Sequence, residues 1–185
     1  MEEKEEGGEF ILERASTKEM TEIFESEKKN HLDTSPNQNI REAQLKEVEI
    51  DFNYLVNEKL FEKGIHFVVK NKTGKIIASI GFYVEGEEGE IKHFSVDQEY
   101  RKKGLGRKLI QKIFEISKEL NCKSIKLLTI DFMEIAVSFY QKIGFLLYHS
   151  YFVYAIDGEW LNDNCSEMER KGADSAKIML FKIQI

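Results

Sequence analysis

The sequence of 185 residues has little cysteine, a single proline and no long hydrophobic run. Its two cysteines, Cys122 and Cys165, have no CxxC spacing and no clustered histidines nearby, which argues against a disulfide framework or a zinc site. No segment approaches the roughly 20 apolar residues that cross a bilayer. The acidic opening MEEKEEGGE also differs from a secretory signal. We therefore expect a cytoplasmic protein that uses no metal and no membrane.

Acidic residues outnumber basic ones, 33 to 27, and the formal net charge is −6. Sequence-independent binding to nucleic acid depends on widespread Lys and Arg, so no nucleic-acid partner is expected. The apolar content of 42% suffices for one buried core. We predict a single domain over residues 1–185, with residues 1–9 as a flexible acidic tail, in a monomer or homodimer.

Hydrophobic periodicity predicts the secondary structure. Helical spacing or capping patterns predict four helices, over residues 16–27, 39–56, 104–120 and 132–145. Apolar runs bounded by turns predict strands over residues 10–15, 65–70, 76–84, 90–96, 124–130, 146–156 and 176–185. The alternation of both kinds of element indicates an α/β protein.

Basic residues nevertheless gather in one place, the stretch VDQEYRKKGLGRKLIQKIF from Val96 to Phe114. It lies where a predicted strand is followed by a helix, and the free amides and dipole of a helix N-terminus bind anions. A phosphate loop would need Gly-Lys-Ser/Thr, and a dinucleotide fingerprint would need a small residue at Leu109. Neither is present, and an Arg-x-x-Gly-x-Gly pattern remains, from Arg101 to Gly106.

This pattern, Arg101-Lys-Lys-Gly104-Leu-Gly106, resembles the acetyl-CoA-binding motif of the GNAT acetyltransferase superfamily. The later segment FYQKIGF resembles the second signature of that family, although Met133 stands where the family often has asparagine. The resemblance implies an α/β fold with a mixed, mostly antiparallel central sheet of about six or seven strands. About four helices would flank this sheet, which would be splayed at the cofactor cleft.

The resemblance also implies how acetyl-CoA, the cosubstrate, is bound. Backbone amides of about Lys102 to Arg107 would hold the pyrophosphate, and the strand with Phe94 and Val96 would separate from KLLTI. Its free backbone could then pair with the pantetheine amides as an added strand would. The predicted cofactor-binding residues are Phe94, Ser95, Val96, Arg101, Lys102, Lys103, Gly104, Leu105, Gly106, Arg107 and Tyr140.

Transfer of an acetyl group to an amine needs a base for the amine and a proton for the departing thiolate. Glu90 resembles the general-base glutamate of the histone-acetylating branch, and His93, with an intrinsic pKa near neutrality, is the competing candidate. Tyr140 occupies the place of the family's general acid. Cys122 reads as a small core residue, so no covalent nucleophile is evident and direct transfer in a ternary complex is expected.

The predicted function is therefore acetyl-CoA-dependent N-acetylation of a primary amine, on a small molecule or a peptide. The acidic residues Glu85, Glu87, Glu88 and Glu90 could attract a cationic amine, although solvated turns give the same pattern. Residues 31–40 could line the acceptor cleft, as the corresponding helix connection does in the family. The alternatives are a non-catalytic module of the same fold that binds coenzyme A or a protein, and a nucleic-acid-binding domain that uses the basic helix.

Overall fold

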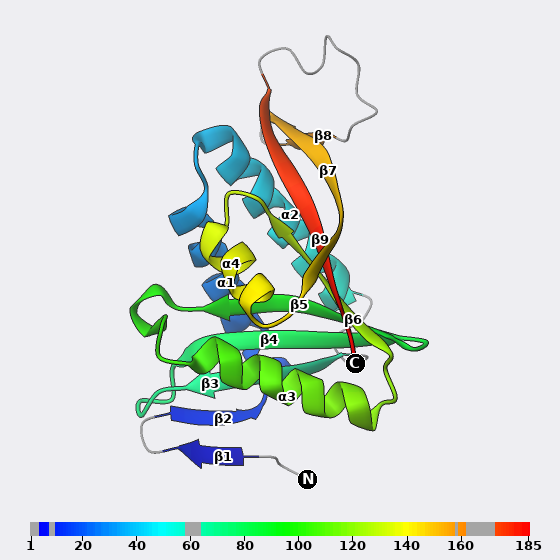
Figure 1. Ribbon diagram of the computed structural model, residues 1–185. Coiled ribbons are helices and arrows are strands. Elements are labelled where there is room, and N and C mark those ends of the chain that lie inside the picture. Colours follow the sequence, from blue (N-terminus) through cyan, green and yellow to red (C-terminus); the bar gives the residue numbers. More distant parts are fainter. Residues whose placement is uncertain (1–3, 8–9, 58–63, 158, 162–172) are drawn as a thin grey trace.

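The computed structural model describes residues 4–7, 10–57, 64–157, 159–161 and 173–185 (Figure 1). The nine strands of these residues form one sheet in the order β1-β2-β3-β4-β5-β6-β9-β7-β8. The strands are β1 (Lys4–Gly7), β2 (Phe10–Arg14), β3 (Ile65–Lys70), β4 (Ile76–Glu85), β5 (Glu88–Val96), β6 (Ser124–Ile130), β7 (Leu146–Ile156), β8 (Glu159–Leu161) and β9 (Asp174–Gln184). Only β5 and β6 are parallel among these pairs, which confirms the mixed, mostly antiparallel sheet.

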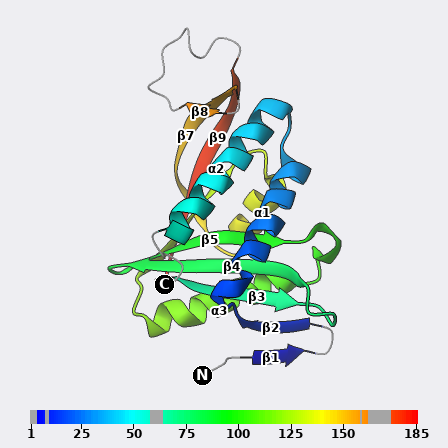
Figure 2. The same ribbon diagram turned by 180° about the vertical axis from the view of Figure 1, so that it is seen from behind.

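Helices cover both faces of the sheet. Figure 1 shows α3 and α4 in front of the strands, and Figure 2 shows α1 and α2 on the opposite face. The bounds are α1 (Met20–Thr34), α2 (Gln38–Asn57), α3 (Leu105–Glu119) and α4 (Glu134–Lys142), with short 3₁₀ turns η1 (Thr17–Glu19) and η3 (Gln98–Tyr100). The four predicted helices are therefore confirmed within the described part of the chain.

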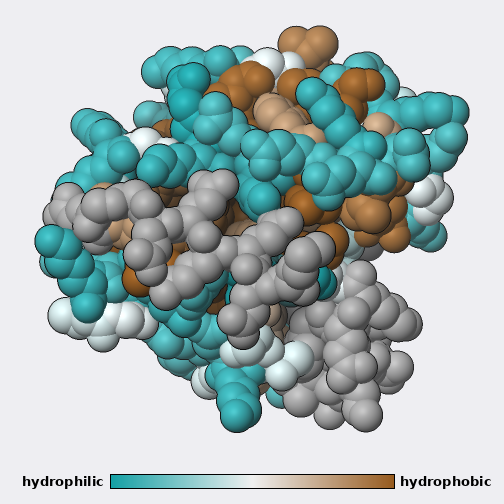
Figure 3. Space-filling view, turned by 90° about the horizontal axis from the view of Figure 1, so that it is seen from below, coloured by the Kyte–Doolittle hydropathy of each residue, from teal (hydrophilic) through white to brown (hydrophobic). Residues whose placement is uncertain are grey.

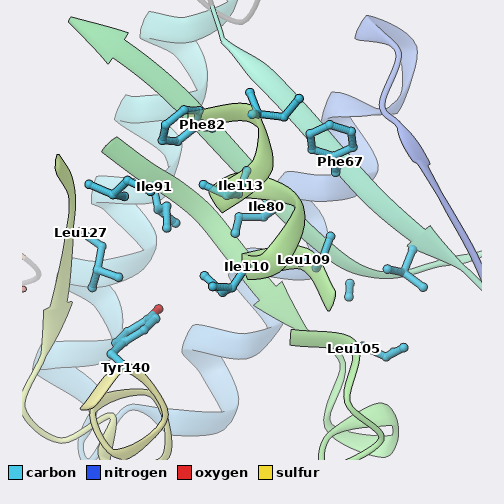
Figure 4. Packing of buried hydrophobic residues seen from close by; sticks show 14 of the residues in the cluster. Phe67, Ile80, Phe82, Ile91, Leu105, Leu109, Ile110, Ile113, Leu127 and Tyr140 are labelled. Atoms are coloured by element: carbon cyan, nitrogen blue, oxygen red, sulfur yellow. The ribbon is translucent and has the colours of Figure 1, made fainter. Parts of the chain in front are cut away.

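The main core lies between α3 and the sheet, as the spacing of apolar residues in α3 predicts. Leu105, Leu109 and Ile113 are buried against Phe67, Ile80, Phe82 and other strand residues (Figure 4). A smaller cluster under α1 and α2 contains Phe24, Val48 and Val68. The sheet is thus buried on both faces along its middle strands.

The sheet opens between β5 and β6. Parallel pairing joins Glu88–Ile91 to Ser124–Leu127 and then ends, although β5 continues to Val96 and β6 to Ile130. The predicted separation of the strand containing Phe94 from KLLTI is therefore present. The backbone of the last residues of β5 has no partner on β6.

Two strands lie outside the prediction. Residues 4–7, expected in a flexible tail, form β1 and pair with β2 from Lys4–Glu13 to Gly7–Phe10. The three-residue strand β8 pairs with β7. Both strands depend on backbone hydrogen bonds to a neighbour. KEEG has no hydrophobic pattern, and EWL is too short to show one.

Two boundaries also differ from the prediction. Helix α1 continues to Thr34, well beyond the expected end at Glu27, and Lys28 on its extension forms ion pairs with Glu25 and Glu49 at 3.3 and 3.5 Å. Strand β5 begins at Glu88, because the hairpin turn to β4 is short. Glu90 is therefore inside the strand, where its side chain has a defined face.

The surface seen from below mixes hydrophilic and hydrophobic residues (Figure 3). No helix in the described part of the chain has the length and apolar character that crossing a membrane requires.

Candidate active site

The glycine loop, residues 101–107, connects β5 through η3 to α3. Gly104 has φ +83°, and Lys102 has φ +63°, so the backbone turns through the left-handed region twice. The first helical hydrogen bond of α3 runs from the Lys108 amide to the Gly104 carbonyl oxygen at 3.1 Å. The amides of residues 102–107 donate to no other described residue, so this loop presents a series of free N–H groups.

The two glycines serve different purposes. A Cβ atom on Gly104 would meet nothing within 4 Å, so this side of the loop is open to a ligand. A Cβ atom on Gly106 would lie 3.3 Å from Phe94 Cζ and 3.5 Å from Phe139 Cζ, which is tight packing. Gly106 therefore lets α3 approach β5 closely, and the loop as a whole fits a phosphate-bearing ligand such as coenzyme A.

Arg101 braces the loop from within the protein. Its Nε donates to the Val96 carbonyl oxygen at 3.0 Å, and one terminal nitrogen donates to Asn30 Oδ1 at 2.7 Å. These bonds join the loop to the end of β5 and to α1. The ammonium of Lys103 lies 4.7 Å from the ring centroid of Tyr100.

Three predicted residues, Phe94, Ser95 and Val96, form the side of the opening that belongs to β5. Phe94 and Val96 pack against the main core. Ser95 is buried toward the other face, with its hydroxyl oxygen 3.0 Å from that of Ser79. Their main-chain groups have no partner on β6, although the Val96 carbonyl oxygen accepts the hydrogen bond from Arg101 Nε.

Tyr140, on α4, lies on the α3 side of the sheet at this opening. Its ring centroid is 6.2 Å from that of Phe94 and 6.1 Å from that of Phe181. Figure 4 shows the ring among the core side chains, near Leu127 and Ile110. Burial raises the pKa of the Tyr140 phenol above its usual range, so the hydroxyl keeps its proton at neutral pH.

His93 lies on the opposite face of β5, at a bulge. The register with β4 shifts between Ser79 and Gly81, and His93 has φ +51°. Its Nδ1 lies 3.0 Å from Oε2 of Glu27 on α1. Its Nε2 is buried and has no hydrogen-bond partner among the residues that the structure describes.

His93, Glu27, His66 and Tyr83 together form what we call the histidine face of the sheet. The His66 ring is stacked 6.1 Å from the His93 ring, and its Nε2 lies 3.0 Å from the Tyr83 hydroxyl. Burial, the neighbouring His93 and Arg14 lower the pKa of His66 to about 4, so His66 is neutral at pH 7. Phe24 of α1 covers the group, with its ring 4.8 Å from that of His93.

Glu90 borders the histidine face, since it is the register partner of Tyr83. Its carboxylate is partly exposed, and Oε1 lies 3.6 Å from the Lys92 ammonium. Burial and the charges of Glu27, Asp51 and Glu90 raise the pKa of the Tyr83 phenol, which places these carboxylates around it. Tyr140 and Glu90 are thus on opposite faces of the sheet at β5.

The other acidic residues of the predicted cluster are mostly neutralised by lysines. Glu87 pairs with Lys123 at 2.6 Å. Glu88 pairs with Lys126 at 2.8 Å and also with Lys182, and hydrogen bonds from these lysines lower its pKa to about 2. The turn therefore offers less negative charge than its sequence indicates.

The connection between α1 and α2 is shorter than the predicted segment 31–40, and Ile40 is buried against Ile130, Val153 and Ala176. Met133 is the N-cap residue of α4, and its sulfur accepts a weak hydrogen bond from Thr129 Oγ1 at 3.8 Å. No group of three or more potential metal ligands converges within the described ranges.

The sequence alone does not identify Glu27, His66 and Tyr83 as site residues. Glu27 is 66 positions from His93. The predicted helix ends at Glu27, so the prediction does not say in which direction the Glu27 side chain points. One signal in the sequence could have indicated His66 as a site residue, namely its position as a polar residue inside the apolar strand IHFVVK.

A mixed sheet that opens between two parallel strands, beside a glycine loop at a helix N-terminus, is the arrangement that the sequence resemblance implies. The chain belongs to the acetyltransferase (GNAT) family, whose sequence profile matches residues 18–145. The chain is 37% identical over 79 residues to the uncharacterized protein YdhI of Bacillus subtilis (strain 168), and these cover 43% of this chain and 48% of YdhI.

It is also 34% identical over 80 residues to glucosamine 6-phosphate N-acetyltransferase of Trypanosoma brucei brucei, covering 40% of this chain and 52% of that protein. The matches thus span about half the length of these curated relatives. A GNAT family acetyltransferase from Elizabethkingia anophelis, solved with acetyl-CoA bound, superposes with a TM-score of 0.60 at 12% identity. The superposition covers 97% of this chain and 100% of the other chain, and it shows that the two proteins share a fold.

Proposed function

We propose that this protein transfers the acetyl group of acetyl-CoA to a primary amine, directly and in a ternary complex. The observation that carries the proposal is the row of free amides in the glycine loop, next to the opening between β5 and β6. A loop of this kind suits a pyrophosphate, and an unpaired strand backbone suits an extended chain that carries amide groups. Coenzyme A has both features.

In this proposal the amides of Lys102 to Arg107 bind the pyrophosphate, and Lys102, Lys103 and Arg107 add positive charge. Those main-chain groups of Phe94 to Val96 that have no protein partner hydrogen-bond the pantetheine amides. The relative solved with acetyl-CoA bound supports this choice of cosubstrate. Arg101 and Leu105 keep the loop in place, since Arg101 binds Val96 and Asn30 and Leu105 is part of the core.

Tyr140 is the proposed general acid. As the C–S bond of the thioester breaks, the Tyr140 hydroxyl donates its proton to the sulfur. Its raised pKa keeps that proton available at neutral pH. Burial also raises the pKa of the Cys122 thiol, which disfavours the thiolate that an acetyl-cysteine intermediate would need.

The acceptor amine approaches from the side of α1 and α2. The carboxylates of Glu27, Asp51 and Glu90 gather around Tyr83 there, and negative charge attracts a cationic amine. The N-acetyltransferase named among the relatives also acts on an amino compound, glucosamine 6-phosphate. The base belongs to β5, where Glu90 and His93 both face this side.

The proposal is tested by thermal denaturation with acetyl-CoA, followed by a screen of amines with detection of acetylated products by mass spectrometry. At a hundredfold excess over its dissociation constant, acetyl-CoA should stabilise the protein by about 2.7 kcal/mol. The screen should include polyamines, aminoglycosides, amino acids and peptides with free N-termini.

The absence of a thermal shift at millimolar acetyl-CoA would contradict coenzyme A binding. A shift without any acetylated product would favour the non-catalytic binding module. Retention of nucleic acid through purification at moderate salt would instead favour the nucleic-acid-binding reading.

A further inference from the structure

We propose that His93 is the general base of this reaction and that Glu27 is a positioning residue which holds its imidazole in the reactive tautomer. The inference rests on the proposed acetyl transfer and selects one of the two candidate bases on β5.

The contact between the two side chains assigns the tautomer. Nδ1 of His93 lies 3.0 Å from Oε2 of Glu27, and an ionised carboxylate only accepts hydrogen bonds. Nδ1 therefore carries the proton and donates it to Glu27. Nε2 is left with a lone pair, which is the form of imidazole that accepts a proton.

Nε2 of His93 is buried and has no hydrogen-bond partner within the described part of the chain, although buried polar atoms are normally hydrogen-bonded. The side chain has 4% of its surface exposed. Its backbone also has φ +51°, which a residue with a side chain seldom adopts. Unpaired polar atoms and strained backbone are concentrated at functional sites, where a substrate supplies the missing contact.

The position of His93 suits the reaction. Pairing of β5 with β6 ends at Ile91, two residues before His93, so the imidazole lies beside the opening. The bulge turns its side chain toward α1, whereas Tyr140 packs on the α3 side. Base and acid thus stand on opposite faces of β5, as they would if the amine entered from one face and the thiol left from the other.

The protons balance in this arrangement. His93 Nε2 takes one proton from the cationic amine, and the neutral nitrogen then forms a bond to the acetyl carbon. As the C–S bond breaks, the sulfur takes the proton of Tyr140, and the nitrogen releases its second proton to solvent, from which Tyr140 is reprotonated. The imidazolium is stabilised by the Glu27 carboxylate and then releases its proton to solvent, so that one proton leaves for each cationic amine acetylated.

Glu90 is less suited to this role, because its carboxylate is partly solvated and lies 3.6 Å from the Lys92 ammonium. Each element that packs around His93 contributes a titratable or charged group that faces His93 or its immediate neighbours. They are Glu27 from α1, Asp51 from α2, Arg14 from β2, His66 from β3, Tyr83 from β4 and Glu90 from β5.

The first test uses His93→Asn, because asparagine tolerates the left-handed backbone at this position. Its turnover number at pH 7 should fall about 10²-fold, with KM for acetyl-CoA unchanged, and the loss should shrink at alkaline pH, where the amine is neutral. Glu27→Gln should lower turnover about tenfold. Glu25→Gln is the matched control, because it removes the same charge from an exposed position of the same helix, and it should leave turnover unchanged.

The second test needs no turnover. In ¹⁵N NMR of the free protein, the imidazole of His93 should be in the Nδ1–H tautomer. It should lose that preference in Glu27→Gln, but not in Glu25→Gln.

The inference is overturned if His93 is in the Nε2–H tautomer, or if His93→Asn turns over like wild type while Glu90→Gln abolishes the pH dependence. In that event acetyl-CoA binding and wild-type turnover would persist, and the proposed function would stand. Failure of the proposed function itself would instead appear as wild-type protein that neither binds acetyl-CoA nor acetylates any amine.

Discussion

The glycine loop and the histidine face are built in opposite ways. The loop uses backbone amides from consecutive residues, 102–107, and an open glycine at position 104. The histidine face uses side chains from three strands and a helix, and its two main contacts join residues 17 and 66 positions apart. A ligand site made from consecutive backbone groups can be recognised in one stretch of sequence. A site made from side chains of several elements comes together only when the sheet has formed.

This difference should also appear in how each region tolerates substitution. The loop depends on backbone conformation, so a change of its shape should damage it more than the loss of one charged side chain. The histidine face depends on hydrogen bonds between particular atoms, so it should be sensitive to changes that preserve shape. Four further experiments test this contrast.

The largest effect on acetyl-CoA binding is expected for Gly104→Val. A branched side chain is strained at φ +83° and would occupy the open side of the loop, so most of the acetyl-CoA stabilisation of about 2.7 kcal/mol should vanish. Gly74→Val is the matched control, because Gly74 also has φ +83° and open space but lies in the turn between β3 and β4. Thermal denaturation should show similar destabilisation of both variants and loss of the acetyl-CoA response in Gly104→Val alone.

Tyr140→Phe should lower turnover about 10²-fold, because it removes the proposed acid and keeps the buried ring. The melting temperature and the acetyl-CoA shift should stay near wild type, since the ring contacts with Phe94 and Phe181 remain. Tyr148→Phe, at a residue that is 71% exposed, controls for loss of a phenol elsewhere. Turnover of Tyr140→Phe within a few-fold of wild type would remove Tyr140 from the catalytic residues.

His66 should make the protein less stable in mild acid. The folded protein keeps His66 neutral down to about pH 4, whereas an unfolded chain binds the proton near pH 6.5, so protons favour the unfolded state between these values. The free energy of unfolding should therefore fall by up to about 3 kcal/mol as the pH drops through this window. His66→Gln should flatten the decrease in urea denaturation, and His149→Gln, at an exposed residue, should not.

The smallest effect is expected for Glu88→Gln. Its ion pairs with Lys126 and Lys182 are partly exposed, so their loss should cost about 1 kcal/mol or less. KM for a cationic acceptor should stay within about twofold of wild type, because Glu88 is engaged with lysines and lies outside the histidine face. A large rise in KM would instead indicate that the acidic turn is part of the acceptor site.

Most elements of the fold are predictable from the sequence, because each carries its own periodicity. The apolar positions of α3 and the buried strand SIKLLTI are examples. Strand β1 is not predictable in this way, since its pairing with β2 leaves no apolar pattern in KEEG. The extension of α1 beyond Glu27 likewise depends on contacts such as that of Lys28 with Glu49 on another helix.

The candidate site divides along the same line. The glycine loop is predicted residue by residue, with its position before α3, because its motif is contiguous. The bulge at His93 is not predicted, because it is a shift in register between β4 and β5 and therefore depends on two strands. For the same reason the sequence leaves Glu90 and His93 as alternatives, and the partner of His93 on α1 is absent from the prediction.

The order of the sheet also affects how the chain is assembled during synthesis. Strand β9 lies between β6 and β7, although it follows both in the sequence. The edges of β6 and β7 that it joins are without this neighbour until roughly 28 further residues have followed the end of β7, which is a few seconds at ordinary rates of translation. Unpaired strand edges recruit other strands. The nascent protein is therefore most prone to misassembly and aggregation in this interval, and chaperone binding should be strongest there.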